Sequence, residues 1–189
     1  MLNHNLEQMA RAVFDNLYGS GQEGTLSELI TVKYGKDHKK LADGSIPVYG
    51  SGGIMRFADT ALYNGESVLI PRKGTLNNVI YVNKPFWSVD TMFYTEMKHP
   101  NVAKFVYFFV RTNDLASMDA GSAVPSMTTK ILNELSLIIP TESELSNFEK
   151  TVAPLFVQIH TNNDENKYLA ETRDTLLPRL MNGELTANG

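Results

Sequence analysis

Residues 142–182 read ESELSNFEKTVAPLFVQIHTNNDENKYLAETRDTLLPRLMN, and this stretch decides how the chain is organised. Apolar side chains recur in it at alternating steps of three and four residues, which is the a/d pattern of a coiled coil. The seam comprises Leu145, Phe148, Val152, Leu155, Ile159, Asn162, Asn166, Leu169, Arg173, Leu176 and Leu180. The pattern predicts one long helix whose seam faces another helix. A long helix that packs only on its own domain is the alternative.

Two residues bear on the length of this helix. Pro154 lacks an amide donor and clashes with the preceding turn. It therefore predicts either a kink or a helix that ends and restarts with proline in its first turn. Gly183 is the expected stop of the helix.

Asn162 and Asn166 are polar residues at seam positions, where such residues cost stability but fix register and partner number. If two copies pack antiparallel about a dyad between residues 162 and 163, Leu145 faces Leu180 of the second copy. If Pro154 breaks the helix, the centre of that pairing moves towards residue 167.

The N-terminal segment, residues 3–18, predicts a short amphipathic helix. Asn3 is the expected N-cap, and Gly19-Ser20-Gly21 is the expected stop. One face of this helix is apolar and needs a partner surface; it consists of Leu6, Met9, Ala10, Val13, Phe14 and Leu17.

The middle of the chain, about 25–140, mixes short strands, turns and helices. Thr25 predicts the cap of a short helix that contains Leu26, Leu29 and Ile30, and a second helix is expected at 101–113. Expected strands are Ile46–Tyr49, Ser67–Ile70, Asn78–Val82 and Ser136–Ile139. Expected turns are Asp43-Gly44, Gly50–Gly53, Asn64-Gly65, Lys73-Gly74 and Asn83–Pro85. The fold class is therefore α+β, one mixed α/β domain with many loops, preceded by a short amphipathic helix and followed by a long coiled-coil helix.

The composition is that of one globular domain. The chain has 189 residues, of which 42% are hydrophobic and 20% charged, and this argues against disordered, collagen-like and membrane classes. It has no cysteine and no closely spaced histidines, so neither a disulfide framework nor a recognisable metal motif is present, and no metal or cofactor is expected. The polar N-terminus does not resemble a signal peptide, which is compatible with a cytoplasmic protein.

Charge is segregated along the chain. The net charge of −4 and the pI of about 5.6 argue, taken alone, against a nucleic-acid binder. Residues 31–130, however, carry 12 basic and 8 acidic residues, a net +4, whereas the flanks carry 5 basic and 13 acidic residues, a net −8. The net charge of the whole chain is therefore the sum of a basic central region and acidic flanking helices. A solvated surface is the alternative explanation of this modest excess.

No convincing catalytic motif is present. Gly50-Ser51-Gly52-Gly53 matches neither a phosphate loop nor a nucleophile elbow, so a structural turn is expected. Asn83-Lys84-Pro85-Phe86 departs from the amino-methyltransferase signature at Lys84, and Trp87 is expected to belong to the core. Asp90 and Glu96 are a weak carboxylate pair. The sequence is therefore interpreted as non-enzymatic.

Several segments, in order, resemble the specificity (S) subunits of type I restriction–modification systems. Leu62–Thr75 (LYNGESVLIPRKGT), Pro85–Thr91 (PFWSVDT), Gly121–Ser126 and Leu135–Pro140 resemble their target recognition domain. Glu165–Leu169 and Arg173–Leu185 resemble their conserved spacer helix. The resemblance implies a DNA-binding, non-catalytic subunit whose spacer helices pair in an antiparallel coiled coil and dock the methyltransferase (M) subunits, and through them the restriction (R) subunits.

The resemblance also implies a division of the chain: 1–20 an N-terminal spacer part, 21–141 the target recognition domain, 142–185 the spacer helix and 186–189 a tail. With one recognition domain, the chain looks like a half-subunit that forms a homodimer; half of a longer subunit, or a truncated one, is the competing account. A non-DNA-reading assembly module and a small enzyme with its site at Gly50–Gly53 are alternative functions.

Basic and polar side chains in the loops are the expected contacts to double-stranded DNA, since lysine and arginine bind phosphates and loop side chains read bases. These candidates are Lys33, Lys36, Lys39, Lys40, Arg72, Lys73, Asn77, Ser126, Thr128 and Lys130. The expected dimer and partner interface is the seam, comprising Leu145, Phe148, Val152, Leu155, Ile159, Asn162, Asn166, Leu169, Leu176 and Leu180.

Overall fold

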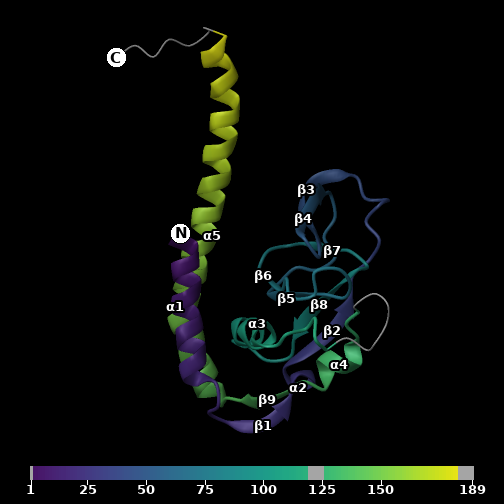
Figure 1. The fold of residues 1–189 in the computed structure, drawn as a ribbon, viewed down its shortest axis with the longest axis vertical. Helices are drawn as coiled ribbons and strands as arrows, with labels where there is room; N and C mark the ends of the chain where they lie inside the picture. The colour runs from purple at the N-terminus through teal and green to yellow at the C-terminus, as the bar shows by residue number, and fades with distance from the viewer. Residues whose placement is uncertain (1, 119–125, 183–189) are drawn as a thin grey trace. The chain divides into compact units, whose positions relative to one another are not determined.

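The computed structural model describes residues 2–118 and 126–182, which divide into two compact units (Figure 1). The sheet unit is Phe14–Glu149, and the helical unit is Met1–Val13 with Lys150–Gly189. Both boundaries fall inside helices. The helices are α1 (Leu2–Leu17), α2 (Leu26–Leu29), α3 (Ala103–Thr112), α4 (Thr129–Asn133) and α5 (Glu142–Met181).

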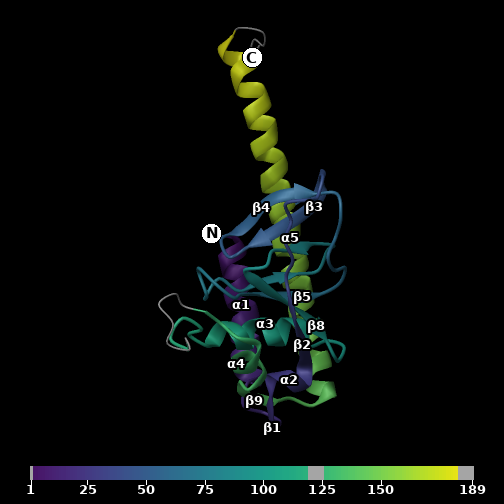
Figure 2. The ribbon, with the colours of Figure 1, turned by 90° about the vertical axis from the view of Figure 1, so that its right-hand side faces the viewer.

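Within the described part of the chain, three small sheets form the sheet unit. The largest has the order β2-β8-β5-β6, the second β4-β3-β7, and the third pairs β1 with β9. The strands are β1 (Gln22–Thr25), β2 (Ile30–Tyr34), β3 (Asp43–Gly50), β4 (Gly53–Ala58), β5 (Ser67–Pro71), β6 (Ile80–Val82), β7 (Trp87–Ser88), β8 (Met92–Met97) and β9 (Ser136–Ile139). The β3–β4 hairpin lies at one end of this unit, and α2 and α4 lie at the other (Figures 1 and 2). This confirms the expected mixed α/β class.

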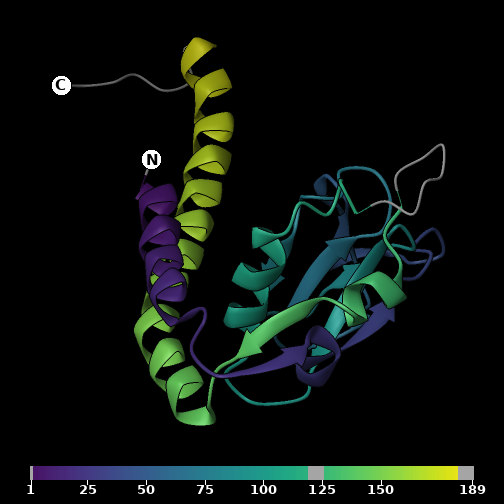
Figure 3. The same cartoon turned by 60° about the horizontal axis from the view of Figure 1, so that its bottom comes forward.

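The core is built where β5 and β8 are buried on both faces and α3 covers the sheet beside β5 and β6 (Figure 3). All residues of α3 from Ala103 to Val110 are buried. Two aromatic residues of α3, Phe105 and Phe108, pack with Phe14 of α1 and Phe148 of α5, with ring centroids 5.4–6.5 Å apart. Such aromatic pairs contribute beyond their buried area. The start of α5 is thereby fixed onto the sheet unit.

Local signals at helix starts are partly confirmed. Thr25 caps α2, and Glu28 completes the reciprocal capping box through the Thr25 backbone N–H at 2.7 Å. Ile30, however, begins β2 instead of ending the helix. Asp43-Gly44 lies inside β3 and is no turn, and the pairing with β4 shifts register there. Strands β1, β2, β4, β7 and β8 and helix α4 were not expected.

The helix α5 is continuous through Pro154, so it neither ends nor restarts there. Thr141 and Glu144 form a capping box at its start: the Thr141 N–H donates to Glu144 at 2.8 Å, and the Glu144 N–H donates to the Thr141 hydroxyl at 3.3 Å. The expected stop, Gly183, lies outside the described residues. No helix in the described ranges has the length and apolar character needed to cross a membrane.

In the helical unit, the start of α1 runs alongside α5 and uses its polar seam residues. Asn3 is a helical residue and not the N-cap. Its amide N–H donates to Asn163 Oδ1 at 2.7 Å, and its Oδ1 accepts from the Asn162 amide at 2.7 Å. Asn162 is thus paired within its own chain.

The seam of α5 divides into a covered part and an open part. Leu145, Phe148 and Val152 are buried in the chain itself, which contradicts the expected register with Leu145 opposite Leu180 of a second copy. Leu155, Ile159 and Asn162 are half-buried. The seam from Asn166 onwards, including Leu169, Leu176 and Leu180, is exposed.

Candidate nucleic-acid interface

The C-terminal ends of strands β2 and β5 lie next to each other, and the residues after both strands are hydrogen-bonded to the turn of residues 88–92. Just past the end of β2, the Gly35 N–H donates to the Met92 carbonyl at 3.0 Å, and the Lys36 N–H donates to the Ser88 carbonyl at 2.8 Å. Just past the end of β5, the N–H groups of Arg72 and Lys73 both donate to the Thr91 carbonyl, at 2.8 and 3.2 Å. The backbone of this turn therefore brings three cationic residues to one edge.

Gly35 allows this close approach. A Cβ atom there would lie 2.0 Å from the Val89 carbonyl oxygen and 2.6 Å from that of Ser88, which no side chain can accommodate. Glycine is the residue that lets two backbone segments come this near.

The side chains of Arg72 and Tyr34 are also held in place. The Arg72 guanidinium lies 5.3 Å from the centroid of the Tyr34 ring, and its Nη1 donates to the Asp90 carbonyl at 3.4 Å. The Tyr34 ring packs edge-on against Phe93. A cation held over an aromatic face keeps its charge and a defined position. We call Tyr34, Lys36, Arg72 and Lys73 the basic edge.

Two further candidates adjoin the basic edge. Ser126 forms an isolated antiparallel bridge with Lys73, and the neighbouring Met127 N–H donates to the Arg72 carbonyl at 3.0 Å. Lys39 and Lys40 follow Lys36 in the same loop and are exposed. Six of the ten candidates therefore belong to two adjacent loops and the segment paired with them.

The other four candidates make contacts within the chain. Lys33 lies on β2, 3.8 Å from the Glu96 carboxylate. The Asn77 side chain donates to Asp114 at 2.9 Å and accepts from the Ala116 N–H at 3.2 Å, so it braces a loop. Thr128 is the N-cap of α4, accepting from the Ile131 N–H. Lys130 is on α4, 4.0 Å from Glu134 and at the other end of the sheet unit from the β3–β4 hairpin (Figure 1).

The β3–β4 hairpin carries exposed apolar side chains that were not among the candidate residues. Ile54, Met55 and Phe57 on β4 are 52%, 60% and 39% exposed. The hairpin turn of Gly50–Gly53 is structural, as expected, with Gly53 at φ +114°. The apolar residues directly after this glycine turn were the available signal for an exposed strand.

Comparison with known proteins places these features in a family. The family model for the type I restriction modification DNA specificity domain matches residues 21–168, which is more than half of the chain. The chain belongs to this family. The matched range contains the whole basic edge, the β3–β4 hairpin and the first part of α5.

Curated relatives in this family are specificity subunits. The chain is 36% identical over 92 residues to the type I restriction enzyme HindI specificity subunit of Haemophilus influenzae, covering 49% of this chain and 18% of that protein. It is 28% identical over 130 residues to the MjaIX specificity subunit of Methanocaldococcus jannaschii, covering 66% of this chain and 30% of that protein. The chain thus matches less than a third of the length of either relative.

Solved structures show the same fold. The S subunit of a type I restriction–modification system from M. genitalium superimposes with a TM-score of 0.75 at 20% identity, covering 95% of this chain and 55% of that chain. The HsdS subunit from Thermoanaerobacter tengcongensis gives a TM-score of 0.55 at 11% identity, covering 97% and 52%. The long helix after the mixed α/β domain is therefore part of the specificity-subunit fold.

A buried ionic cluster lies in the sheet unit of this specificity domain, away from the basic edge. The Lys104 Nζ lies 2.8 Å from Glu66 Oε1 and 2.6 Å from Glu149 Oε1, and it sits over the Tyr81 ring. Burial would raise the pKa of Glu66, but hydrogen bonds from Lys104 and Tyr81 outweigh it and hold that pKa below its ordinary value. Burial first, and then the bond to Glu66, raises the pKa of Tyr81. This cluster ties α3 and the β5–β6 region to the start of α5.

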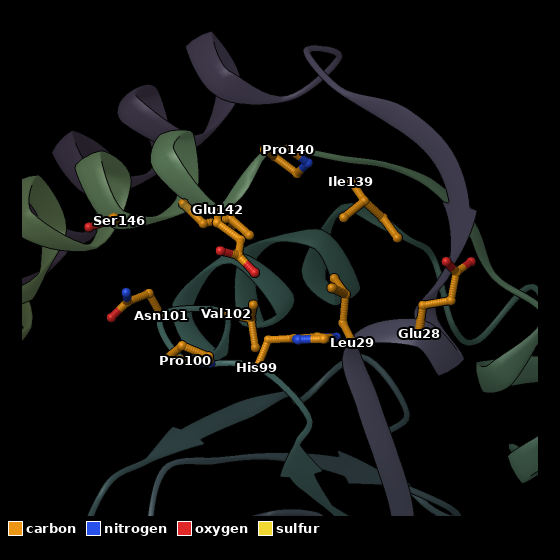
Figure 4. A pocket seen from close by; sticks show the side chains of 11 residues that line it. Glu28, Leu29, His99, Pro100, Asn101, Val102, Ile139, Pro140, Glu142 and Ser146 are labelled. Carbon is orange, nitrogen blue, oxygen red and sulfur yellow. The ribbon is translucent and has the colours of Figure 1, made fainter.

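A cavity of about 390 Å³ lies in the specificity domain between α2, the β8–α3 turn, β9 and the start of α5 (Figure 4). Apolar side chains such as Leu29, Val102 and Leu145 line it together with His99 and Glu142. Across residues 2–118 and 126–182, no cluster of His, Asp or Glu that could hold a metal ion is present.

Proposed function

We propose that this chain supplies the DNA-reading part of a type I restriction–modification specificity subunit. In this account residues 21–141 are a target recognition domain that reads one half of a bipartite site. Residues 142–185 are a spacer helix that pairs with a second copy and docks the methyltransferase subunits, which in turn recruit the restriction subunits. Residues 1–20 belong with the spacer, and 186–189 form a tail.

The observation that carries the proposal is the basic edge inside the family match. Three cations, Lys36, Arg72 and Lys73, are anchored there by backbone hydrogen bonds to one turn, and the exposed Lys39 and Lys40 follow in the same loop. Clustered cations on loops supply the phosphate contacts that provide most of the affinity for DNA. The curated relatives are named as specificity subunits of restriction enzymes, which supports this assignment.

The structure favours some candidate contacts over others. Arg72 retains guanidinium N–H groups beyond the one that donates to Asp90, so it can donate to a phosphate or a base edge. Asn77 and Thr128 already use their side-chain groups within the chain. We therefore assign the phosphate-binding role to the basic edge with Lys39, Lys40 and Ser126, and leave Lys33 and Lys130 as peripheral contacts.

The open part of the seam supports the second half of the proposal. Leu169, Leu176 and Leu180 are exposed on α5, together with Tyr168 and Leu177. An exposed apolar row of this kind is typical of a surface that another helix covers. We assign this row, and not the buried Leu145, Phe148 and Val152, to the contact with a second copy or with a methyltransferase subunit.

The salt dependence of DNA binding tests the proposal. The complex of this chain with its methyltransferase subunit is titrated with duplex DNA at several salt concentrations. Lys73→Ala and Arg72→Ala are each expected to weaken binding and to lower the slope of log K against log salt by about one unit. Lys98→Ala is the matched control, because Lys98 is exposed just beyond the opposite end of β8. Unchanged affinity and slope in both edge variants would remove the basic edge from the interface.

A pure assembly module is the second candidate function, favoured by the open seam alone. It predicts that the chain binds the methyltransferase subunit but leaves the DNA footprint of that subunit unchanged. A footprint that appears only with this chain, and is lost with Lys73→Ala, rules it out.

A further inference from the structure

Among the residues that the structure describes, strand β4 is an edge strand with exposed apolar side chains. It is the outer strand of the sheet β4-β3-β7, so one of its sides lacks a strand partner in that sheet. Three residues along it, Ile54, Met55 and Phe57, are exposed by 52%, 60% and 39%. Proteins usually protect edge strands with charges, prolines or a covering segment, so an apolar edge marks a contact surface.

A bulge sets the position of Met55. Tyr49 pairs with Ile54 and Val48 pairs with Arg56, which leaves Met55 as the extra residue in β4. The Met55 side chain lies across Gly50, since a Cβ atom on that glycine would be 2.4 Å from the Met55 sulfur. Bulges bend a strand and redirect a side chain, and they recur beside functional sites.

The base of the hairpin is joined to the first basic loop. The Arg56 guanidinium donates to the Leu41 carbonyl at 3.1 Å, and the Asp59 N–H donates to the Ala42 carbonyl at 3.1 Å. Leu41 and Ala42 directly follow Lys40, and Lys36 and Lys39 come shortly before it. These three lysines therefore lie on the loop that runs into the base of the hairpin.

The tip of the hairpin is joined to the second basic loop. The Asn78 side chain donates to the Ser51 carbonyl at 2.7 Å, and a Cβ atom on Gly74 would lie 2.7 Å from the Ser51 hydroxyl. Arg72 and Lys73 directly precede this glycine. The apolar strand is thus connected at both ends to loops that carry cations.

We propose that β4 enters the major groove of DNA and that Ile54, Met55 and Phe57 contact base edges there, while the two basic loops hold the phosphates on either side. This inference rests on the proposed function. The major groove, about 12 Å wide, admits a two-stranded ribbon, and its thymine methyl groups accept apolar side chains. Protein–protein interfaces are depleted in lysine, so the flanking lysines favour DNA over a protein as the occupant.

The test uses the complex of the chain with its methyltransferase subunit and a duplex that contains the recognised site. That site is first obtained by mapping methylation in cells that carry both proteins. Each base pair of the site is then replaced in turn, and the loss of affinity is measured for the wild type, for Met55→Ala and for Ile54→Ala. Lys98→Ala is again the matched control, because Lys98 is exposed just beyond the end of β8 that lies opposite the basic edge.

The wild type is expected to lose on the order of tenfold in affinity at each read position. Met55→Ala and Ile54→Ala are expected to abolish that loss at one or two positions while the salt slope stays unchanged, because neither residue binds phosphate. Met55→Ala is expected to fold, since truncating a side chain that is 60% exposed leaves no cavity.

The contrary outcomes separate the inference from the proposed function. Unchanged profiles in both hairpin variants, with a weakened Lys73→Ala, would overturn the inference and leave the proposed function standing. Loss of the methyltransferase subunit from the complex in Met55→Ala, with the base profile intact, would show that β4 binds protein and would also overturn it. A wild-type complex that binds all duplexes equally would refute the proposed function itself.

Discussion

At the residue scale, Gly35 determines where the first basic loop leaves the sheet. Its Cα faces two backbone carbonyl oxygens that cannot move aside as a flexible side chain could. Gly35→Ala is therefore expected to destabilise the protein by about 1–3 kcal/mol, the usual cost of overpacking. Urea unfolding measures this free energy. Gly52→Ala is the control, because no atom lies within 4 Å of its added Cβ, and it should change stability by less than about 0.5 kcal/mol. Equal effects of the two changes would contradict the assigned contact.

The residues of the basic edge show what a sequence can and cannot say about single positions. Lys36, Arg72 and Lys73 could be chosen from their type and from the turn signals around them. Asn77 and Thr128 are also DNA-binding types, but amides and hydroxyls bond their own chain just as well. The groups that bond the Asn77 side chain lie 37 and 39 positions along the chain, so only the fold could show them.

At the scale of elements, the cluster around Lys104 tests how α3 is attached to the start of α5. The Lys104 side chain is 6% exposed and bonds two carboxylates. Lys104→Met is expected to cost about 1–3 kcal/mol at neutral pH, because it leaves two partly exposed carboxylates without their cationic partner. Lys33→Met, which removes an exposed pair with Glu96, should cost less than about 1 kcal/mol. Similar costs for the two variants would contradict this account.

The same variant has a defined pH dependence. The pKa of Glu66 is lowered in the folded protein, so the stability from this group is present above its ordinary pKa and is lost as the pH falls through the lowered value. The difference in unfolding free energy between wild type and Lys104→Met should therefore be largest near pH 7 and shrink below about pH 4. A difference that stays constant across this range would show that the ion pair is not its source.

Elements with a clear local signal were predictable, and those defined by burial were not. Thr25 signals the start of α2, and Gly50–Gly53 signals a turn. The apolar residues of α3 also predicted a helix correctly. Strand β8 was not predicted because Met92–Thr95 is buried on both faces. Its sequence therefore lacks the alternation of apolar and polar residues that identifies a half-exposed strand. Strand β4 was not predicted because its bulge at Met55 interrupts the same alternation.

At the scale of the whole molecule, the seam of α5 predicted a long helix correctly but did not say what covers it. Periodicity shows that a face is apolar, whereas the partner depends on the rest of the fold. Phe14, Phe105 and Phe108 cover Phe148, and Asn3 pairs with Asn162. Among the described residues, the seam is exposed from Asn166 onwards.

Association through that open part can be measured by light scattering at micromolar concentration. The wild type is expected to show the mass of two chains, and Leu169→Asp with Leu176→Asp the mass of one, 21.1 kDa, because charges in a seam prevent its burial. Lys167→Ala, on the same helix but off the seam, should leave the dimer intact. A wild-type mass of 21.1 kDa would argue strongly against the two-copy arrangement.

The most direct test of the central claim, that this chain reads a DNA sequence, is to map methylated bases in cells that carry the chain with its methyltransferase subunit. The account predicts one new methylated motif with two halves separated by an unread gap, the halves being inverted repeats if two copies act together. The absence of any new motif, in cells where the same methyltransferase subunit is active with another specificity subunit, would contradict it.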